Sequence, residues 1–249
     1  MVNKTARRKF IKKILGSFTL AAMPFPFFGM KPLKKAERVS SSFEYHTINH
    51  FLIHQKMRIA YILFDDLTLL DFIGIYDPLS RIKSQKHLSD FEWDLCALKP
   101  SIKDSFGLEV AIDKVKPDLS SYDMIIIPGG FGTRSLQSDL EFVQWIEGAQ
   151  KVPYKVSICT GSLLLGAAGL LTDKTATTHF NEYEALKQYG CQVVPQRIVD
   201  DANVITAGAV ASSLDLGLYL CEKLVGPEKA EEIRKSMDYT PGKYTIIEK

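Results

Sequence analysis

Three short, almost wholly apolar runs constrain the fold of this chain more than any other feature. They cover residues 58–64, 123–127 and 154–158, and residues with helical spacing over 67–82, 140–150 and 160–171 follow them. Continuous apolar strands of this length are typical of parallel sheets, because both faces of such a sheet are buried. The alternation predicts an α/β fold in which helices cover both faces of a mostly parallel sheet.

The rest of the body continues this alternation. Shorter strand-like runs cover 91–98, 175–178, 192–194, 197–199 and 204–206, and helical patterns cover 181–188, 210–224 and 227–237. A turn signal at Asp104-Ser105-Phe106-Gly107 predicts a small hairpin over 101–112. Ligands of open α/β sheets bind outside the carboxyl ends of the strands. We therefore expect the loops at 65–71, 128–132 and 159–160 to meet at one edge.

Cys159 stands where an apolar strand turns directly into a helical pattern. A strand that breaks sharply into a helix presents its corner side chain at the sheet edge, over the positive end of the helix dipole. A thiol placed there tends to ionise, and the thiolate is the nucleophilic form. The alternative is a buried cysteine that acts as a small hydrophobic residue.

Two other loops at the same edge supply candidate partners for the thiol. Gly129 and Gly130 allow close backbone approach, and their N–H groups, with that of Thr160, are candidates for an oxyanion site. Asp71 begins a helix among apolar residues, where a raised pKa lets a carboxyl group carry a proton near neutral pH. The alternatives are a plain turn for the two glycines and helix capping for Asp71.

The charge distribution argues against a nucleic-acid-binding function. The chain has 249 residues, 46% of them hydrophobic, which suits one globular domain with a full core. Its first 38 residues contain ten Lys or Arg and one acid, which leaves 21 basic against 28 acidic residues in the remainder. An acidic body lacks the surplus Lys and Arg needed to neutralise phosphates.

The first 30 residues resemble an export signal. The run from Thr5 to Lys12 is similar to a twin-arginine motif, and the apolar stretch over 14–30 is interrupted by Pro24 and Pro26. This predicts a periplasmic protein, with an uncleaved membrane tether or an ordinary basic tail as alternatives. Residues 31–56 read as a linker. Its histidines at 46, 50 and 54 would share one face of a helix and offer a metal site, or else lie in a solvated tether.

The other three cysteines, Cys96, Cys191 and Cys221, are far apart and form no CxxC pair. The spacing signals neither a zinc knuckle nor a redox pair. We interpret all three as residues that fill the core.

Several segments together resemble the ThiJ/PfpI superfamily, a glutamine amidotransferase-like group, and within it the isocyanide (isonitrile) hydratases. The matching segments cover residues 64–74, 127–132, 157–171, 176–180 and 199–208, with Asp215 beyond them. The resemblance covers a domain over 57–240 and leaves 241–249 as a tail. It implies a flavodoxin-like three-layer sandwich, a homodimer, no cofactor, Cys159 as nucleophile and Asp71 as its acid.

The resemblance also distinguishes this chain from the protease-like members of the superfamily. Protease-like members place His directly after the cysteine, whereas this chain has Thr160. His179 lies near the sheet as an accessory residue or a structural hydrogen-bonding residue, and Gly208 lies at the substrate cleft. Ala209 and Ser213 replace glycines of a common pattern, so we expect them to reshape that cleft.

We therefore expect a lyase that acts on small electrophiles, with isocyanide hydration to an N-substituted formamide as the specific reaction. The first alternative is glyoxalase- or deglycase-type chemistry through the same thiol. The second is a non-enzymatic ligand or redox sensor. A regulator of the AraC type is disfavoured by the acidic body and by the lack of a DNA-binding segment in the sequence.

Overall fold

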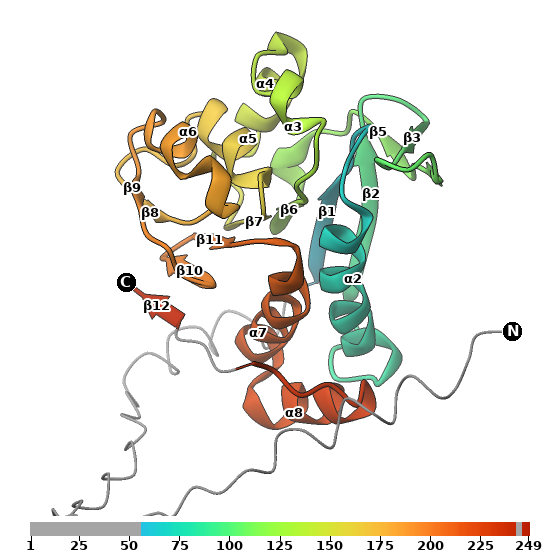
Figure 1. Ribbon diagram of the computed structural model, residues 1–249. Coiled ribbons are helices and arrows are strands. Elements are labelled where there is room, and N and C mark those ends of the chain that lie inside the picture. Colours follow the sequence, from blue (N-terminus) through green and yellow to red (C-terminus); the bar gives the residue numbers. More distant parts are fainter. Residues whose placement is uncertain (1–55, 243–245) are drawn as a thin grey trace, which may run out of the picture. The chain divides into compact units, whose positions relative to one another are not determined.

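The computed structural model of the protein describes residues 56–242 and 246–249, and eight strands in these ranges form one sheet (Figure 1). Their spatial order is β12-β10-β11-β7-β6-β1-β2-β5. Every pair is parallel except β10 with β11, which confirms the mostly parallel sheet. The bounds are β1 (Met57–Ile62), β2 (Phe91–Ala97), β5 (Lys114–Val115), β6 (Met124–Ile127), β7 (Tyr154–Ile158), β10 (Ile198–Asp201), β11 (Val204–Ala207) and β12 (Ile246–Glu248).

Two groups of helices accompany the sheet and complete the three-layer sandwich (Figure 1). One group consists of α2 (Leu69–Ser84), α7 (Ser213–Val225) and α8 (Pro227–Ser236), which pack against one another. In the other group, α5 (Gly161–Ala167) contacts α3 (Thr133–Leu136), α4 (Leu140–Glu147) and α6 (Tyr183–Lys187). The apolar strands β1, β6 and β7 are buried between these layers, as their composition predicts.

Smaller elements decorate this frame. The predicted hairpin is present as β3 (Ser101–Lys103) and β4 (Glu109–Ala111). The strands β8 (Thr175–Ala176) and β9 (Gln192–Val193) pair only with each other, so they form a separate two-stranded sheet. The predicted helix over 210–224 begins as a 3₁₀ turn, Val210–Ser212, before α7.

The strand β12 lies within the segment that the sequence analysis left as a tail. It pairs with β10, and charged side chains tie it to α7 and β10. The Tyr219 hydroxyl donates to Asp200 at 2.6 Å and lies 3.2 Å from a Glu248 oxygen, while Lys223 Nζ donates to Asp200 at 2.7 Å. These contacts join residues that are far apart in the sequence, so no local sequence pattern predicts them.

The predictions for the termini and the cysteines have different outcomes. Cys96, Cys191 and Cys221 are buried and unpaired, which confirms their assignment to the core. The export signal and the three linker histidines lie outside the described residues. Within the ranges the structure describes, no helix combines the length and apolar character that a membrane crossing requires.

Ser213 does not face the cleft as expected, because it packs between α2 and α7. A Cβ atom on Gly74 would lie 2.1 Å from Ser213 Oγ, so glycine at 74 makes room for this side chain. Ser213 is buried, and its hydroxyl has no hydrogen-bond partner. The residue therefore fills a helix contact one turn from Asp71.

The Ser213→Ala substitution should raise the free energy of unfolding by about 1 kcal/mol, because it removes a buried hydroxyl that has no partner. Ser162→Ala is the matched control, since its hydroxyl donates to the Cys159 carbonyl at 3.2 Å and its loss should destabilise the fold. Urea denaturation of both variants measures the difference. Equal destabilisation by the two substitutions would contradict this interpretation of Ser213.

Candidate active site

The turn from β7 into α5 places Cys159 in the left-handed region, with φ of 55°. A non-glycine residue rarely adopts this conformation, and such strain clusters at functional sites. The Cys159 N–H donates to the carbonyls of Ala207 at 3.0 Å and Gly208 at 2.7 Å. Its carbonyl accepts from Thr178 Oγ1 at 2.9 Å. The elbow is therefore held on both sides of the sulfur-bearing residue.

Gly129 allows the acid, the thiol and the helix start to crowd together. A Cβ atom at this position would lie 2.6 Å from Thr160 N and 2.8 Å from both Asp71 Oδ2 and Cys159 Cβ. Gly130 adopts φ of 139°, and a Cβ there would lie 2.4 Å from the Asp66 carbonyl oxygen. The loop after β6 thus packs backbone against backbone on the loop after β1, as predicted for this sheet edge.

Asp71 is fully buried in the first turn of α2, and its Oδ2 accepts the Gly129 N–H at 3.0 Å. The carboxylate therefore bonds to a neighbouring loop rather than capping its own helix. Its other oxygen, Oδ1, accepts no hydrogen bond from an N–H or O–H group of the described residues. Burial raises the pKa of Asp71 from 3.8 to about 6, although the Gly129 N–H and the Cys159 thiol oppose the shift.

The surroundings of the Cys159 thiol oppose the ionisation that the sequence analysis expected at the start of a helix. Burial raises its pKa to about 12, the Asp71 charge adds to this rise, and the N–H of Thr160 opposes it. The Cys159 side chain is only 5% exposed. The helix that follows it, α5, has only seven residues, so its dipole is short. At neutral pH the pair therefore holds one proton on sulfur, beside a carboxylate that can accept it.

Thr160 organises the loop next to the sulfur. Its hydroxyl accepts the Gly130 N–H at 3.0 Å and lies 3.0 Å from the hydroxyl of Thr133. Because the N–H groups of Gly129 and Gly130 bond to Asp71 and Thr160, they position the site and do not form the expected oxyanion hole. The N–H and the hydroxyl of Thr160 both act on the sulfur and lower the pKa of the Cys159 thiol.

The remaining candidates lie in the supporting structure. Gly208 supplies a carbonyl to the Cys159 N–H, whereas the sequence analysis placed it at the substrate. His179 accepts the Asn181 N–H at 3.3 Å and stacks on Phe180 at 4.2 Å, which fits its structural alternative. Sequence reasoning missed Thr133 and Thr178, although Thr178 lies inside a matching segment.

A family model described as the DJ-1/PfpI family matches residues 57–223, which include every residue of this site. The chain belongs to the DJ-1/PfpI family. It is 35% identical over 187 residues to an isonitrile hydratase of Pseudomonas putida, covering 74% of this chain and 79% of that protein. A solved structure of a ThiJ/PfpI family protein from Pseudomonas syringae superimposes with a TM-score of 0.69 at 27% identity, covering 76% and 77% of the two chains.

A DJ-1/PfpI relative with another activity is also similar to this chain. The glutathione-independent glyoxalase DJR-1.2 of Caenorhabditis elegans is 27% identical over 130 residues, which cover 52% of this chain and 68% of that protein.

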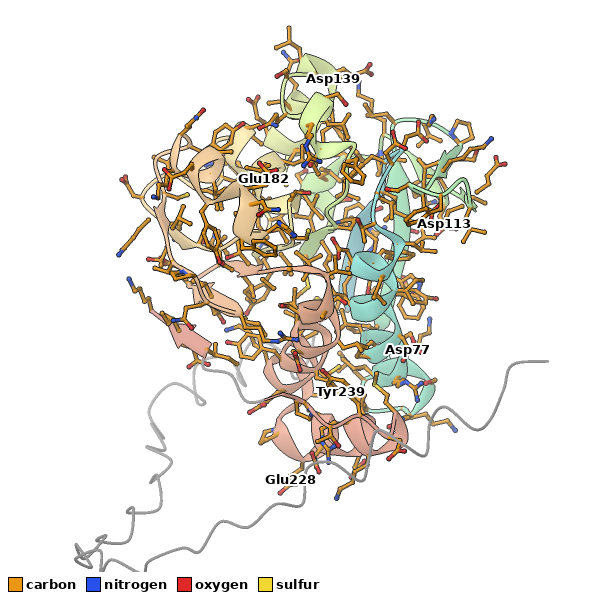
Figure 2. The ribbon with its side chains drawn as sticks, in the orientation of Figure 1. Asp77, Asp113, Asp139, Glu182, Glu228 and Tyr239 are labelled. Carbon is orange, nitrogen blue, oxygen red and sulfur yellow. The ribbon has the colours of Figure 1, made fainter. Side chains whose placement is uncertain are left out.

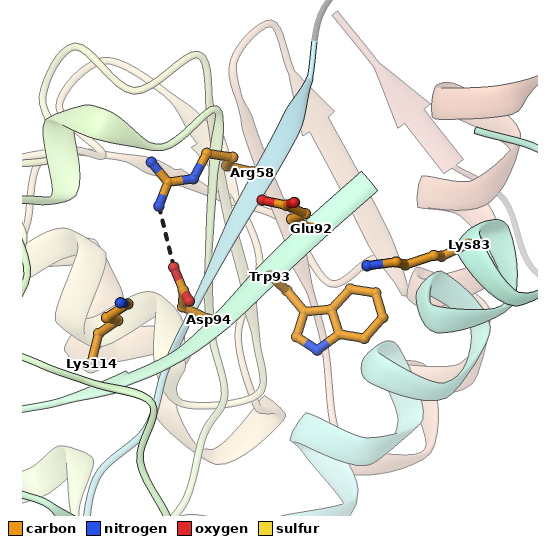
Figure 3. Close-up of a pocket in the computed structure, with 6 residues that line it drawn as sticks. All are labelled: Arg58, Lys83, Glu92, Trp93, Asp94 and Lys114. Atoms are coloured by element: carbon orange, nitrogen blue, oxygen red, sulfur yellow. Dashed lines mark hydrogen bonds and ion pairs between the residues drawn. The ribbon is translucent and has the colours of Figure 1, made fainter. Parts of the chain in front are cut away.

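A separate open pocket of about 500 Å³ lies beside β1 and β2, and neither Cys159 nor Asp71 lines it (Figure 3). Its polar side chains pair with one another, as Arg58 does with Asp94 at 3.4 Å, and Lys83 lies over the Trp93 ring. No cluster of three metal-binding side chains occurs in the portion of the chain that the structure describes. The chemistry of this DJ-1/PfpI protein is therefore best sought at Cys159.

The raised pKa of Asp71 predicts a characteristic dependence of stability on pH. The folded protein binds the Asp71 proton more tightly than the unfolded chain does, so this residue makes stability fall as pH rises from about 4 to 6 and above. Relative to Asp71→Asn, the wild type should lose about 2 kcal/mol of unfolding free energy between pH 4 and pH 7.5. Urea denaturation at several pH values measures this difference.

Asp118→Asn is the control, because hydrogen bonds from the Ser120 hydroxyl and N–H lower the pKa of Asp118. Its wild-type contribution has the opposite sign and is lost as the pH falls. A constant difference between wild type and Asp71→Asn across the pH range would show that Asp71 is not desolvated.

Proposed function

We propose that the protein is a cofactor-free, cysteine-dependent hydratase that converts isocyanides into N-substituted formamides. The observation that supports this most strongly is the buried pair of a protonated thiol and a carboxyl group with a pKa of about 6. Such a pair can remove a proton from sulfur and return it to a substrate. The 35% identity to an isonitrile hydratase supports the same reaction.

The first half of the reaction forms a covalent intermediate. Asp71 takes the thiol proton while Cys159 Sγ attacks the terminal isocyanide carbon and forms the carbon–sulfur bond. The same carboxyl group then delivers that proton to the carbon, which gives a thioimidate. The N–H of Thr160 stabilises the negative charge that the sulfur carries as its proton leaves, before that charge passes to the isocyanide carbon.

The second half consumes water and regenerates the thiol. Asp71, again ionised, accepts a proton from the water that adds to the thioimidate carbon. The carbon–sulfur bond then breaks, one water proton ends on nitrogen and the other returns to sulfur. The sum is one isocyanide and one water for each formamide, with no oxidant, metal or cofactor required.

Two exposed phenyl rings, each close in sequence to a residue that bonds to the elbow, favour an apolar substrate. Phe131 follows Gly130, and Phe180 lies two residues after Thr178, so both neighbour residues that bond to the elbow. They are 67% and 62% exposed, and Arg134 lies 5.0 Å above the Phe131 ring. Exposed apolar side chains in these two segments are better suited to the substituent of an isocyanide than to a small polar carbonyl.

Glyoxalase-type chemistry is the second candidate, because the same thiol would add to an aldehyde carbon and a glyoxalase is among the relatives. The redox-sensor alternative is less favourable. Oxidation proceeds through the thiolate, and burial raises the pKa of the Cys159 thiol, which disfavours that form.

We also propose that the protein forms a homodimer and that its N-terminal segment directs its export. Leu70 and Ile73, on either side of Asp71 on α2, are large exposed apolar residues that a second subunit would cover. The basic residues before the apolar stretch at 14–30 support export to the periplasm.

The direct test incubates purified protein with benzyl isocyanide, a small alkyl isocyanide and methylglyoxal, and follows formamide and lactate by NMR. The wild type should form formamide, and its kcat/KM should rise with pH through about 6 as Asp71 ionises. Cys159→Ser should abolish turnover, and Asp71→Asn should reduce it by about 10²- to 10⁴-fold. Cys191→Ser is the control and should retain activity.

The outcomes separate the candidates. Lactate without formamide would replace the hydratase with the glyoxalase-type function. Absence of both products from wild-type protein with an intact, reduced Cys159 would overturn the enzymatic proposal.

A further inference from the structure

An ion pair at the start of α7 joins the buried carboxylate of Asp215 to the partly exposed side chain of Arg197. Asp215, in the first turn of α7, is fully buried, and Arg197 Nε donates to its Oδ2. Tyr239, labelled in Figure 2, follows α8 and donates its hydroxyl to Asp215 Oδ1 at 2.9 Å. A buried carboxylate with both oxygens engaged fixes the groups around it in one arrangement.

Arg197 reaches the same segment at two further points. Its carbonyl accepts the Gly208 N–H at 3.0 Å, and its Nη2 donates to the Ala211 carbonyl at 2.7 Å. The backbone over 208–211 and the start of α7 are therefore fastened to one residue. Gly208 in turn offers its carbonyl to the Cys159 N–H at 2.7 Å.

We propose that Arg197 and Asp215 are positioning residues that hold the 207–215 segment so that its carbonyls keep Cys159 in the left-handed conformation. The strained φ of 55° persists only if surrounding contacts over-determine it. The contact path is short, since the Arg197 side chain holds the Ala211 carbonyl and Asp215, which follow Gly208 in the chain, and the Gly208 carbonyl accepts the Cys159 N–H. The catalytic part of this inference rests on the proposed function, whereas the structural part does not.

A second ion pair provides a matched control. Lys223 in the last turn of α7 pairs with Asp200 of β10 at 2.7 Å, and both side chains are largely buried. This pair joins α7 to the sheet as the first pair does, but it lies at the far end of the helix and next to β12. Loss of either pair leaves a buried carboxylate without its cation, so both should destabilise the protein.

The test compares Arg197→Gln, Asp215→Asn and Lys223→Met with the wild type, at a temperature where all four are folded. Hydrogen exchange of the Cys159 amide should accelerate by at least about tenfold in the first two variants, because their carbonyl acceptors loosen. In Lys223→Met it should change by less than about twofold. Arg197→Lys should be intermediate, since lysine can pair with Asp215 but cannot also reach Ala211.

Turnover provides the second readout. If the wild type hydrates isocyanides, kcat should fall about 100-fold in Arg197→Gln while KM stays nearly constant, because the sulfur is misplaced and binding is not. If the wild type shows no turnover, the proposed function fails, and the exchange measurement alone decides this inference.

An unchanged Cys159 amide in folded Arg197→Gln, or equal acceleration in Lys223→Met, would overturn the positioning role. Should Arg197→Gln fail to fold, Arg197→Lys and Asp215→Asn give the same comparison.

Discussion

The left-handed backbone at Cys159 is the constraint around which the rest of the site is arranged. It turns the chain from β7 into α5 within one residue and puts the sulfur at the carboxyl edge of the sheet. The segment after β11 binds its N–H, and Thr178 binds its carbonyl. Elements that are distant in the sequence therefore stabilise one residue in a strained backbone conformation.

Close packing then determines the chemistry of the sulfur. Gly129 lets Asp71 lie against Cys159 in a buried place, and burial raises the pKa of both groups. The result is a neutral thiol beside a weak base, which differs from the ready-made thiolate of a helix N-terminus. A neutral resting thiol is spared from oxidation and becomes nucleophilic only as its proton moves to Asp71.

The sequence predicted the frame well, because the apolar runs in β1, β6 and β7 and the helical spacing after them are local signals. Cys159 and Asp71 were also identified from their local context and from the family resemblance. The roles of Gly129 and Gly130 were not, since the partners of their N–H groups depend on how two loops pack. The thiol pKa, the inward packing of Ser213 and the strand β12 likewise depend on contacts between residues far apart in the chain.

The central claim is that Asp71 and Cys159 share one proton, and a titration of the Asp71 carboxyl carbon by ¹³C NMR tests it most directly. The account predicts a midpoint near pH 6 in the wild type. It also predicts a higher midpoint in Cys159→Ala, because that variant loses a thiol hydrogen bond that stabilises the carboxylate. A midpoint near 4 that does not respond to Cys159→Ala would contradict it.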